Sequence, residues 1–270
     1  MTAEVPVATL NARRYAETFA VFVSRSFEYP AMIRRLVDVA ESLPDDFLCL
    51  DIGAGTGMVV RDWLAQTRRK PGRYFAIEPN PAHTSELRVS LSELGIDCEL
   101  DEAAFDTDYV IPGTFDLVLF SHSLYWMAEP IACVALARQS LKPNGKIIAF
   151  LQGPFGDHPM YRLFNPYFKR DRPPGPDHAF SSAELVIGLR ANGIAATVEF
   201  DPTPHDLTRL FDAGNEAERD QYLSFCLQIE FKDLDEPWKS DIVAYLQAAC
   251  FERDERLLWL APNATVTITR

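Results

Sequence analysis

The sequence has 270 residues, of which 47% are hydrophobic and 24% charged, which is ordinary for a globular protein with a large core. Lysine and arginine total 26 against 39 aspartates and glutamates, so the formal net charge is −13. This charge argues against nucleic acid and against an anionic membrane surface, because both require a basic patch. It is compatible with a cationic ligand.

The five cysteines stand in apolar runs and form no C-x-x-C pair, which predicts buried, reduced thiols in a reducing compartment. The N-terminal segment has no basic region followed by an apolar region, as a secretory signal would. No apolar run approaches the roughly 20 residues that a membrane span needs. We therefore expect a cytoplasmic monomer without a membrane partner.

The first predicted elements are two helices, over residues 10–27 and 30–42, where apolar residues recur at helical spacing. Short apolar runs then alternate with amphipathic stretches. The resulting strands are 47–52, 73–77, 96–100, 115–120 and 146–151, and the helices are 58–66, 81–94 and 131–141. Nearly all-apolar strands that alternate with helices are typical of a parallel sheet covered on both faces. The predicted fold class is therefore α/β, a doubly wound Rossmann-like sheet of seven strands.

After residue 152 the β-α-β rhythm stops. The remaining predictions are helices 159–167, 181–192, 207–211, 216–230 and 238–252, a strand 195–200, and a closing hairpin of strands 257–260 and 264–269. No linker separates domains, so we expect one domain over 1–270. Its expected parts are N-terminal helices forming a substrate lid in 1–46, a ligand-binding core in 47–152, a substrate-side helical insertion in 153–255 and closing strands in 256–270.

The most specific motif is D-x-G-x-G-x-G at the end of the first core strand, formed by Asp51, Gly53, Gly55 and Gly57. Glycines let the backbone turn tightly and let a ligand approach it closely. The dinucleotide fingerprint would require glycine where Met58 stands, and a P-loop would require a lysine. The remaining interpretation is the glycine turn of enzymes that use S-adenosylmethionine (SAM). The alternative is a β-α turn without a ligand.

An acidic residue, Glu78, follows the next strand. At the tip of the second strand a carboxylate can accept both hydroxyls of a ribose. Alone it would be a solvated loop residue, but one strand after Gly57 it is expected to bind the cofactor.

A polar and aromatic cluster follows strand 115–120: Ser121, His122, Tyr125 and Trp126. Ligands of doubly wound sheets bind beyond the carboxyl ends of the strands, so this cluster is expected on the methyl-acceptor side. His122 is the candidate catalytic residue, with a structural histidine as the alternative. The five histidines form no metal-binding spacing, and we expect no metal site.

These residues give the chain a resemblance to histamine N-methyltransferases along almost its whole length. The matching segments, in order, are Tyr15-Ala16-Glu17-Thr18-Phe19, Ser26-Phe27-Glu28, Asp51–Gly57, Glu78-Pro79, Asp108-Tyr109, Leu124-Tyr125-Trp126, Gly214-Asn215-Glu216 and Asn263. The resemblance implies that Glu28 and Asn263 hold the polar ends of the substrate. It implies further that the pocket wall is made by Tyr15, Phe19, Tyr125 and Trp126, and that SAM is lined by Gly53, Glu78, His83, Thr107 and Ser121.

The chain departs from the animal enzyme on the acceptor side. His122 replaces a pocket glutamine, and two tryptophans correspond to Asp157 and Tyr161. The expected function is therefore SAM-dependent N-methylation of a small cationic amine or imidazole-type substrate, with S-adenosylhomocysteine as product. One alternative is a natural-product methyltransferase acting on oxygen, carbon or another nitrogen. Another is a SAM- or amine-binding protein without catalysis.

Overall fold

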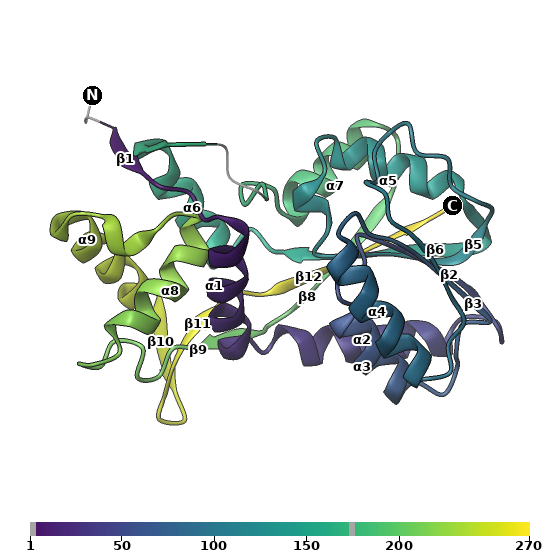
Figure 1. Ribbon diagram of the computed structural model, residues 1–270, viewed down its shortest axis with the longest axis horizontal. Helices are drawn as coiled ribbons and strands as arrows, with labels where there is room; N and C mark the ends of the chain where they lie inside the picture. Colours follow the sequence, from purple (N-terminus) through teal and green to yellow (C-terminus); the bar gives the residue numbers. More distant parts are fainter. Residues whose placement is uncertain (1–3, 173–175) are drawn as a thin grey trace. The chain divides into compact units, whose positions relative to one another are not determined.

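The computed structural model describes residues 4–172 and 176–270 (Figure 1), and these residues divide into two compact units. The three-segment unit comprises the described residues of Met1–Glu28, Gly153–Ala179 and Pro202–Pro262. The sheet unit comprises Tyr29–Gln152, Phe180–Asp201 and Asn263–Arg270. The expectation of one domain over residues 1–270 stays a prediction.

The sheet unit contains a seven-stranded sheet with the strand order β4-β3-β2-β5-β6-β12-β8. Its strands are β2 (Leu48–Ile52), β3 (Arg73–Ile77), β4 (Cys98–Asp101), β5 (Phe115–Ser121), β6 (Leu141–Gln152), β8 (Ala196–Asp201) and β12 (Asn263–Thr269). Strand β12 runs antiparallel to both its neighbours, whereas the pairs among β4, β3, β2, β5 and β6 are parallel. This topology confirms the predicted doubly wound, seven-stranded Rossmann-like fold.

Helices cover both faces of this sheet (Figure 1). One core cluster joins it to α2 (Glu28–Glu41), α3 (Met58–Gln66) and α4 (Pro81–Glu93), and the other to α5 (Pro130–Gln139) and α7 (Ser182–Ala191). Successive residues of a strand point to opposite faces. Cys49 therefore packs in the first cluster and Leu50 in the second, so β2 is buried on both faces of the sheet.

The three-segment unit combines helices with two small sheets. Its helices are α1 (Ala12–Arg25), α6 (Asp157–Phe164), α8 (Glu216–Leu227) and α9 (Glu236–Ala248), with short 3-10 turns η2 (Asn165–Tyr167) and η3 (Phe231–Asp233). Strand β1 (Val5–Val7) pairs in parallel with β7 (Phe168–Arg170). Strands β10 (Cys250–Arg253), β11 (Arg256–Leu260) and β9 (Pro204–Asp206) form an antiparallel sheet. The hydrophobic core of this unit is rich in aromatic rings, with Phe22, Tyr222, Phe225 and Trp259 among its members.

One predicted element of this unit is wrong, and another extends too far. Residues 207–211 form a turn instead of a helix, and Leu207 and Leu210 are both buried in the core of the unit. The predicted helix 238–252 ends at Ala248, and its last residues belong to β10. A short apolar run is compatible with either helix or strand, so its tertiary neighbours decide.

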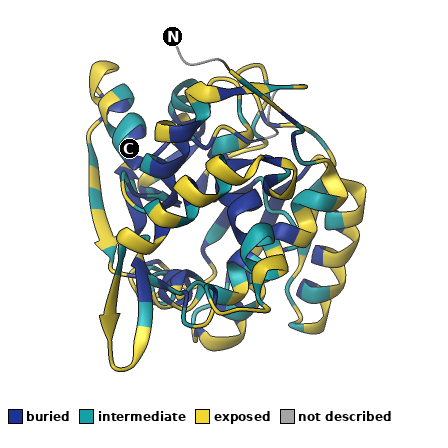
Figure 2. Ribbon diagram, turned by 90° about the vertical axis from the view of Figure 1, so that its left-hand side faces the viewer, coloured by how far each residue is buried: buried dark blue, intermediate teal, exposed yellow. Residues whose placement is uncertain are grey.

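The predicted closing hairpin of residues 257–260 and 264–269 is also wrong, because β11 pairs with β10 and β9 whereas β12 joins the seven-stranded sheet. The actual hairpin turn is Asp254-Glu255, and both residues have positive φ, 51° and 61°. Two-residue hairpins favour such turns but usually use Asn-Gly, which this sequence lacks here. Residues 251–256 are exposed, and the hairpin is largely yellow in Figure 2.

All five cysteines lie in the described residues and are free, as predicted, although Cys98 and Cys250 are only half-buried. Among the described residues, no helix has the length and apolar character to cross a membrane.

Candidate functional site

The glycine turn follows β2, and its three glycines adopt positive φ: Gly53 at 72°, Gly55 at 56° and Gly57 at 72°. The N–H of Gly53 donates to the carbonyl of Ile77 at 2.8 Å, which fastens the turn to β3. A Cβ atom at Gly53 would lie 2.4 Å from Cβ of Ser123, so the protein itself requires glycine there. A Cβ atom at Gly55 would meet nothing within 4 Å. The backbone at Gly55 is therefore open to a ligand.

Glu78 stands at the tip of β3 and is 7% exposed. One carboxylate oxygen, Oε2, accepts the N–H of Gly55 at 2.9 Å. The other, Oε1, accepts the N–H of Asn80 at 3.0 Å and lies 3.3 Å from Nδ1 of His83. A carboxylate has about four acceptor sites, so Glu78 can bind the glycine turn and still accept a ligand hydroxyl. His83 is half-exposed, which leaves its ring accessible at the same strand tip.

Asp51 is fully buried, and its carboxylate accepts a short hydrogen bond from the hydroxyl of Tyr74. Burial raises the pKa of Asp51 to about 7, and the nearby Glu78 adds to the rise, whereas the Tyr74 hydrogen bond opposes it. The side chain thus supports the strand beneath the glycine turn from within the core. Tyr74 was not among the predicted site residues, although its hydroxyl in a largely apolar strand was a signal.

The end of β5 lies beside the end of β2, because these strands are parallel neighbours. The hydroxyl of Ser121 is buried, and within the described residues its Oγ has no hydrogen-bond partner. The hydroxyl of Ser123 donates to the carbonyl of Ile52 at 2.6 Å. A buried polar atom is rarely left without a partner, so Ser121 fits a site that a polar ligand completes.

His122 is the residue directly after β5, and its φ of 54° lies in the left-handed region. Its N–H donates to the carbonyl of Phe150 at 3.0 Å. Tyr125 belongs to the 3-10 turn η1 (Leu124–Trp126), and its hydroxyl lies 3.4 Å from Nδ1 of His122. Trp126 is 55% exposed. The structure therefore brings His122 and Tyr125 together and leaves Trp126 on the surface.

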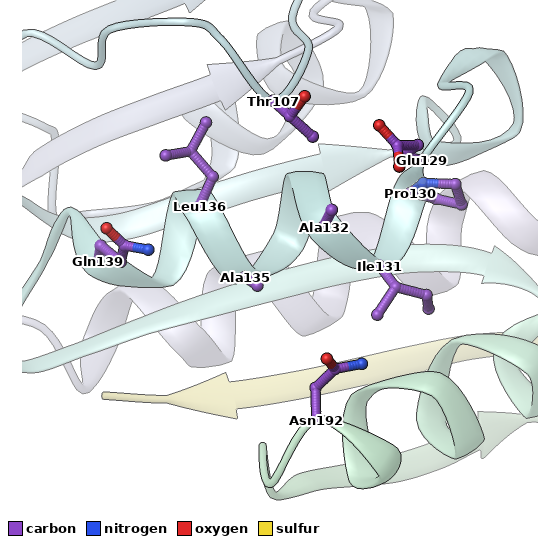
Figure 3. A pocket seen from close by; sticks show the side chains of 9 residues that line it. All are labelled: Thr107, Glu129, Pro130, Ile131, Ala132, Ala135, Leu136, Gln139 and Asn192. Carbon is purple, nitrogen blue, oxygen red and sulfur yellow. The ribbon is translucent and has the colours of Figure 1, made fainter.

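Two further predicted residues of the sheet unit lie elsewhere. Asn263 is the first residue of β12, opposite Gln152 and Asp201 in the ladder, and is 1% exposed. Thr107 is exposed on the loop after β4 and lines an open groove along α5 with a volume of about 540 Å³ (Figure 3). The other lining residues are Glu129, Pro130, Ile131, Ala132, Ala135, Leu136, Gln139 and Asn192.

The three predicted substrate residues near the N-terminus belong to the three-segment unit. The half-buried rings of Tyr15 and Phe19 pack against Phe225, with ring centroids 5.5 and 5.4 Å away. The carboxylate of Glu28 is buried, and its charge acts on the fully buried His205. Burial lowers the pKa of His205 to about 4, and Glu28 opposes this shift. Phe225 and His205 were not predicted as neighbours, because only the folded unit brings them together.

Comparison with known proteins identifies the core segment. Residues 50–147 match the family model described as "Methyltransferase domain". This segment contains the glycine turn, Glu78 and the Ser121–Trp126 cluster. No curated protein matches the chain, so the resemblance to histamine N-methyltransferases is not supported.

Solved structures share the fold over most of the chain. A putative methyltransferase from Bacillus halodurans is 13% identical with a TM-score of 0.57, covering 87% of this chain and 97% of its own. The YcgJ protein of Bacillus subtilis is also 13% identical, with a TM-score of 0.55 and coverage of 89% and 98%. A SAM-dependent methyltransferase from Geobacter sulfurreducens, solved with S-adenosyl-L-homocysteine, is 17% identical with a TM-score of 0.51 and coverage of 94% and 98%. At these sequence identities the similarity shows that the fold is shared, and nothing more.

The domain match and the shared fold confirm the prediction made from the glycine turn. Residues 50–147 are a methyltransferase domain, and the fold is that of solved methyltransferases, among them one that depends on S-adenosylmethionine. The roles of the individual site residues stay predictions.

Proposed function

We propose that this methyltransferase transfers the methyl group of SAM to a nitrogen of a small cationic amine or imidazole-type, histamine-like substrate. The observation that supports the cofactor site most directly combines two features. The backbone at Gly55 is open, and one strand away the buried hydroxyl of Ser121 has no partner in the part of the chain that the structure describes. Both features lie at the carboxyl edge of parallel strands, where doubly wound sheets bind their ligands.

The residues present fit SAM by their chemistry. Glu78 supplies carboxylate oxygens for ribose hydroxyls, the backbone at Gly55 allows close approach, and Ser121 supplies a hydroxyl. Asp51, Gly53 and Gly57 hold the turn, and His83 and Thr107 are proposed as further cofactor contacts. When bound, SAM supplies a methyl group attached to a sulfonium sulfur. The thioether that departs is already a good leaving group. The protein therefore acts mainly by positioning the reactants.

For the acceptor, the support comes from charge and aromatic character. Glu28 is a buried carboxylate, and Tyr15 and Phe19 offer half-buried rings in the same unit. A carboxylate and aromatic faces are the groups that bind an ammonium in proteins. An imidazole nitrogen with a pKa of about 6.5 is mostly neutral at pH 7 and can attack, whereas an alkyl ammonium cannot. In the sheet unit, Tyr125, Trp126 and Asn263 are proposed as further substrate-binding residues.

Calorimetry with SAM tests the cofactor site. Gly55→Val places a branched side chain into the open space, so SAM affinity should fall tenfold or more while the protein stays folded. The matched control is Gly95→Val, because Gly95 also has positive φ, 68°, and its added Cβ also meets nothing within 4 Å. Unchanged affinity in folded Gly55→Val would place the cofactor elsewhere.

A panel of small biogenic amines tests the acceptor, with S-adenosylhomocysteine production as readout. Glu28→Gln keeps the shape and removes the charge, so kcat/KM for a cationic acceptor should fall by roughly 30–150-fold, or ~2–3 kcal/mol. SAM affinity should stay at the wild-type value. Glu236→Gln is the control, because Glu236 also stands in the first turn of a helix of the chain. Wild-type turnover of the preferred amine by Glu28→Gln would reject the cationic acceptor.

The same panel separates the other candidate functions. Turnover with neutral phenols or carbon acids alone would favour a natural-product methyltransferase, and SAM binding without any turnover would favour a non-catalytic binding protein. The cytoplasmic location, the monomeric state and the absence of nucleic-acid or membrane partners stay predictions.

A further inference from the structure

The seven-stranded sheet ends in two edge strands, β4 and β8. An edge strand presents backbone N–H and C=O groups to a further strand, and proteins guard such edges with charge, proline or short length. In the part of the chain that the structure describes, β8 has β12 as its one strand neighbour. It has six residues against the four of β4, and it contains neither lysine nor proline. The β8 edge is therefore the longer of the two and carries fewer guards.

The two faces of β8 differ in character. Thr197 is exposed, and the side chain of Glu199 is 62% exposed even though it pairs with Arg35 of α2. On the opposite face, Ala196 and Val198 pack against the core cluster that includes α5 and α7. The strand is therefore polar and open on the face of α2 and apolar on the other.

The sequence of β8 restricts how it can pair with a second copy of itself. In an antiparallel pair about a two-fold axis, opposite residues point to the same face, whereas successive residues point to opposite faces. The axis must therefore pass beside one residue. At Glu199 it would place this carboxylate against itself, and at Phe200 it would place Glu199 against Asp201. At Thr197 it would pair three residues of the strand, whereas at Val198 it pairs five without opposing two acids.

We infer that β8 pairs antiparallel with β8 of a second copy about a two-fold axis at Val198, which joins the two sheets edge to edge. Val198 then faces Val198 of the second copy, and Thr197 faces Glu199 of the second copy. This places a hydroxyl against a carboxylate twice on the face of α2. Because one short strand per copy makes a small interface, the dimer is reversible, and the monomer expected from the sequence persists in dilute solution.

The same construction fails at the other edge of the sheet. In β4, an axis at Glu99 would place this carboxylate against itself, and an axis at Leu100 would place Glu99 against Asp101. Like charges that stand directly opposite each other destabilise a strand pair. The acidic residues of β4 thus repel a second copy, whereas β8 offers one register that is free of such repulsion.

Sedimentation equilibrium of the unmodified protein alone tests this inference first. It requires no substrate, so its outcome is independent of the proposed function. We expect a reversible monomer–dimer equilibrium between roughly 1 and 300 µM, as for a weak interface. Association should stop at two copies, because the β4 edges of the dimer repel each other. A monomer throughout this range, or association beyond the dimer, would overturn the inference.

Thr197 permits a test by charge, because it faces Glu199 of the second copy twice in the dimer. Thr197→Lys places an ammonium against this carboxylate, and Thr197→Glu places a second carboxylate there. The dissociation constant of Thr197→Glu should exceed that of Thr197→Lys by roughly tenfold or more, and the difference should shrink at high salt. The matched controls are Thr269→Lys and Thr269→Glu, since Thr269 is also exposed but lies in β12, which has a strand on each side. An equal difference between the two control variants would overturn the inference.

Oxidative cross-linking tests the register. Residues directly opposite in an antiparallel pair have Cα atoms about 4.5–5.5 Å apart, within the reach of a disulfide, whereas diagonal neighbours are about 7–8 Å apart. Val198→Cys stands opposite itself and should link two copies, whereas Thr197→Cys is a diagonal neighbour of itself and should link slowly. The unmodified protein, with its five free cysteines, is the control. Faster linking by Thr197→Cys than by Val198→Cys would overturn the register.

Discussion

The two units differ in the sequence distance over which their contacts are made. In the sheet unit the neighbours β2 and β3, or β5 and β6, follow each other with one helix between them. In the three-segment unit, β1 at Val5–Val7 pairs with β7 at Phe168–Arg170. A local β-α-β unit can be predicted from the sequence pattern, whereas a strand pairing across so many residues depends on how the whole chain folds. The difference shows why one unit was predicted almost strand by strand and the other only in part.

The units also bury ionisable groups of opposite pH response. Burial raises the pKa of Asp51 in the sheet unit to about 7 and lowers the pKa of His205 in the three-segment unit to about 4. Both shifts keep the buried group neutral. The sheet unit should therefore weaken as pH rises and the three-segment unit as pH falls. Hydrogen exchange, read by mass spectrometry on peptides of each unit, can follow the two responses separately.

The largest expected effect is that of Asp51→Asn on the sheet unit. Because the folded pKa lies above the ordinary value of 3.8, the stabilising contribution of protonated Asp51 is complete below pH 3.8 and is lost as pH rises through about 7. The asparagine variant should gain about 3 kcal/mol relative to the wild type between pH 5 and 8. Asp45→Asn is the control, since Asp45 is 88% exposed. Equal pH dependence of variant and wild type would contradict the buried-carboxyl account.

The next effect tests the three-segment unit. His205 has a folded pKa below the ordinary histidine value of 6.5, so its contribution to stability is complete above pH 6.5 and is lost as pH falls through about 4. Between pH 6.5 and 5 the wild-type unit should lose about 2 kcal/mol, and His205→Gln should flatten this loss. Exchange of peptides from α8 and β9 measures it. If His83→Gln, a change at a half-exposed histidine, flattened the loss equally, the assignment to His205 would be wrong.

The glycine turn permits a sharper test within the sheet unit. Gly53 and Gly55 both have positive φ, so alanine strains the backbone at either position. Only at Gly53 does the added Cβ meet the protein, 2.4 Å from Cβ of Ser123. Urea unfolding should show Gly53→Ala to be less stable than Gly55→Ala by about 1–2 kcal/mol. Equal destabilisation would mean that the strands separate enough to absorb the methyl group.

The smallest effect concerns an ion pair of the three-segment unit. Arg14 binds Glu230 through Nε at 2.9 Å and Nη2 at 3.2 Å, and the two side chains are 19% and 12% exposed. A double-mutant cycle of Arg14→Gln and Glu230→Gln should give a coupling of about 1 kcal/mol, since the pair is bidentate and partly buried. The exposed pair of Arg253 and Asp254 should give a coupling near zero in the same experiment.

The sequence pattern predicted the parts of the fold that local chemistry determines. Helix α3 and strand β3 begin and end where expected, because Gly57 precedes one and a continuous apolar run defines the other. The three-residue strands β1, β7 and β9 carry no local signal, and their pairing partners stabilise them. Strand β10 falls in a stretch that was predicted as helix, and its pairing with β11 stabilises it as a strand.

The candidate site shows the same division. The meeting of Glu78 with the glycine turn follows from strands that end at one edge of a parallel sheet, and it could be predicted. The burial of Asp51 against Tyr74 could not, because the motif gives no side-chain direction. Likewise the hydrogen bond from Gln152 to Tyr125 joins residues that are distant in the sequence.

The position of β12 in the sheet has a consequence for the order in which the chain is made. Six of the seven strands precede it, yet β12 lies between β6 and β8 and pairs with both. During synthesis β8 therefore has no place in the sheet until Thr269 has left the ribosome, and β6 presents an unpaired edge until then. The emerging chain should stay partly open and depend on chaperones or fast completion, and a premature stop before Asn263 should give an aggregating product instead of a smaller folded enzyme.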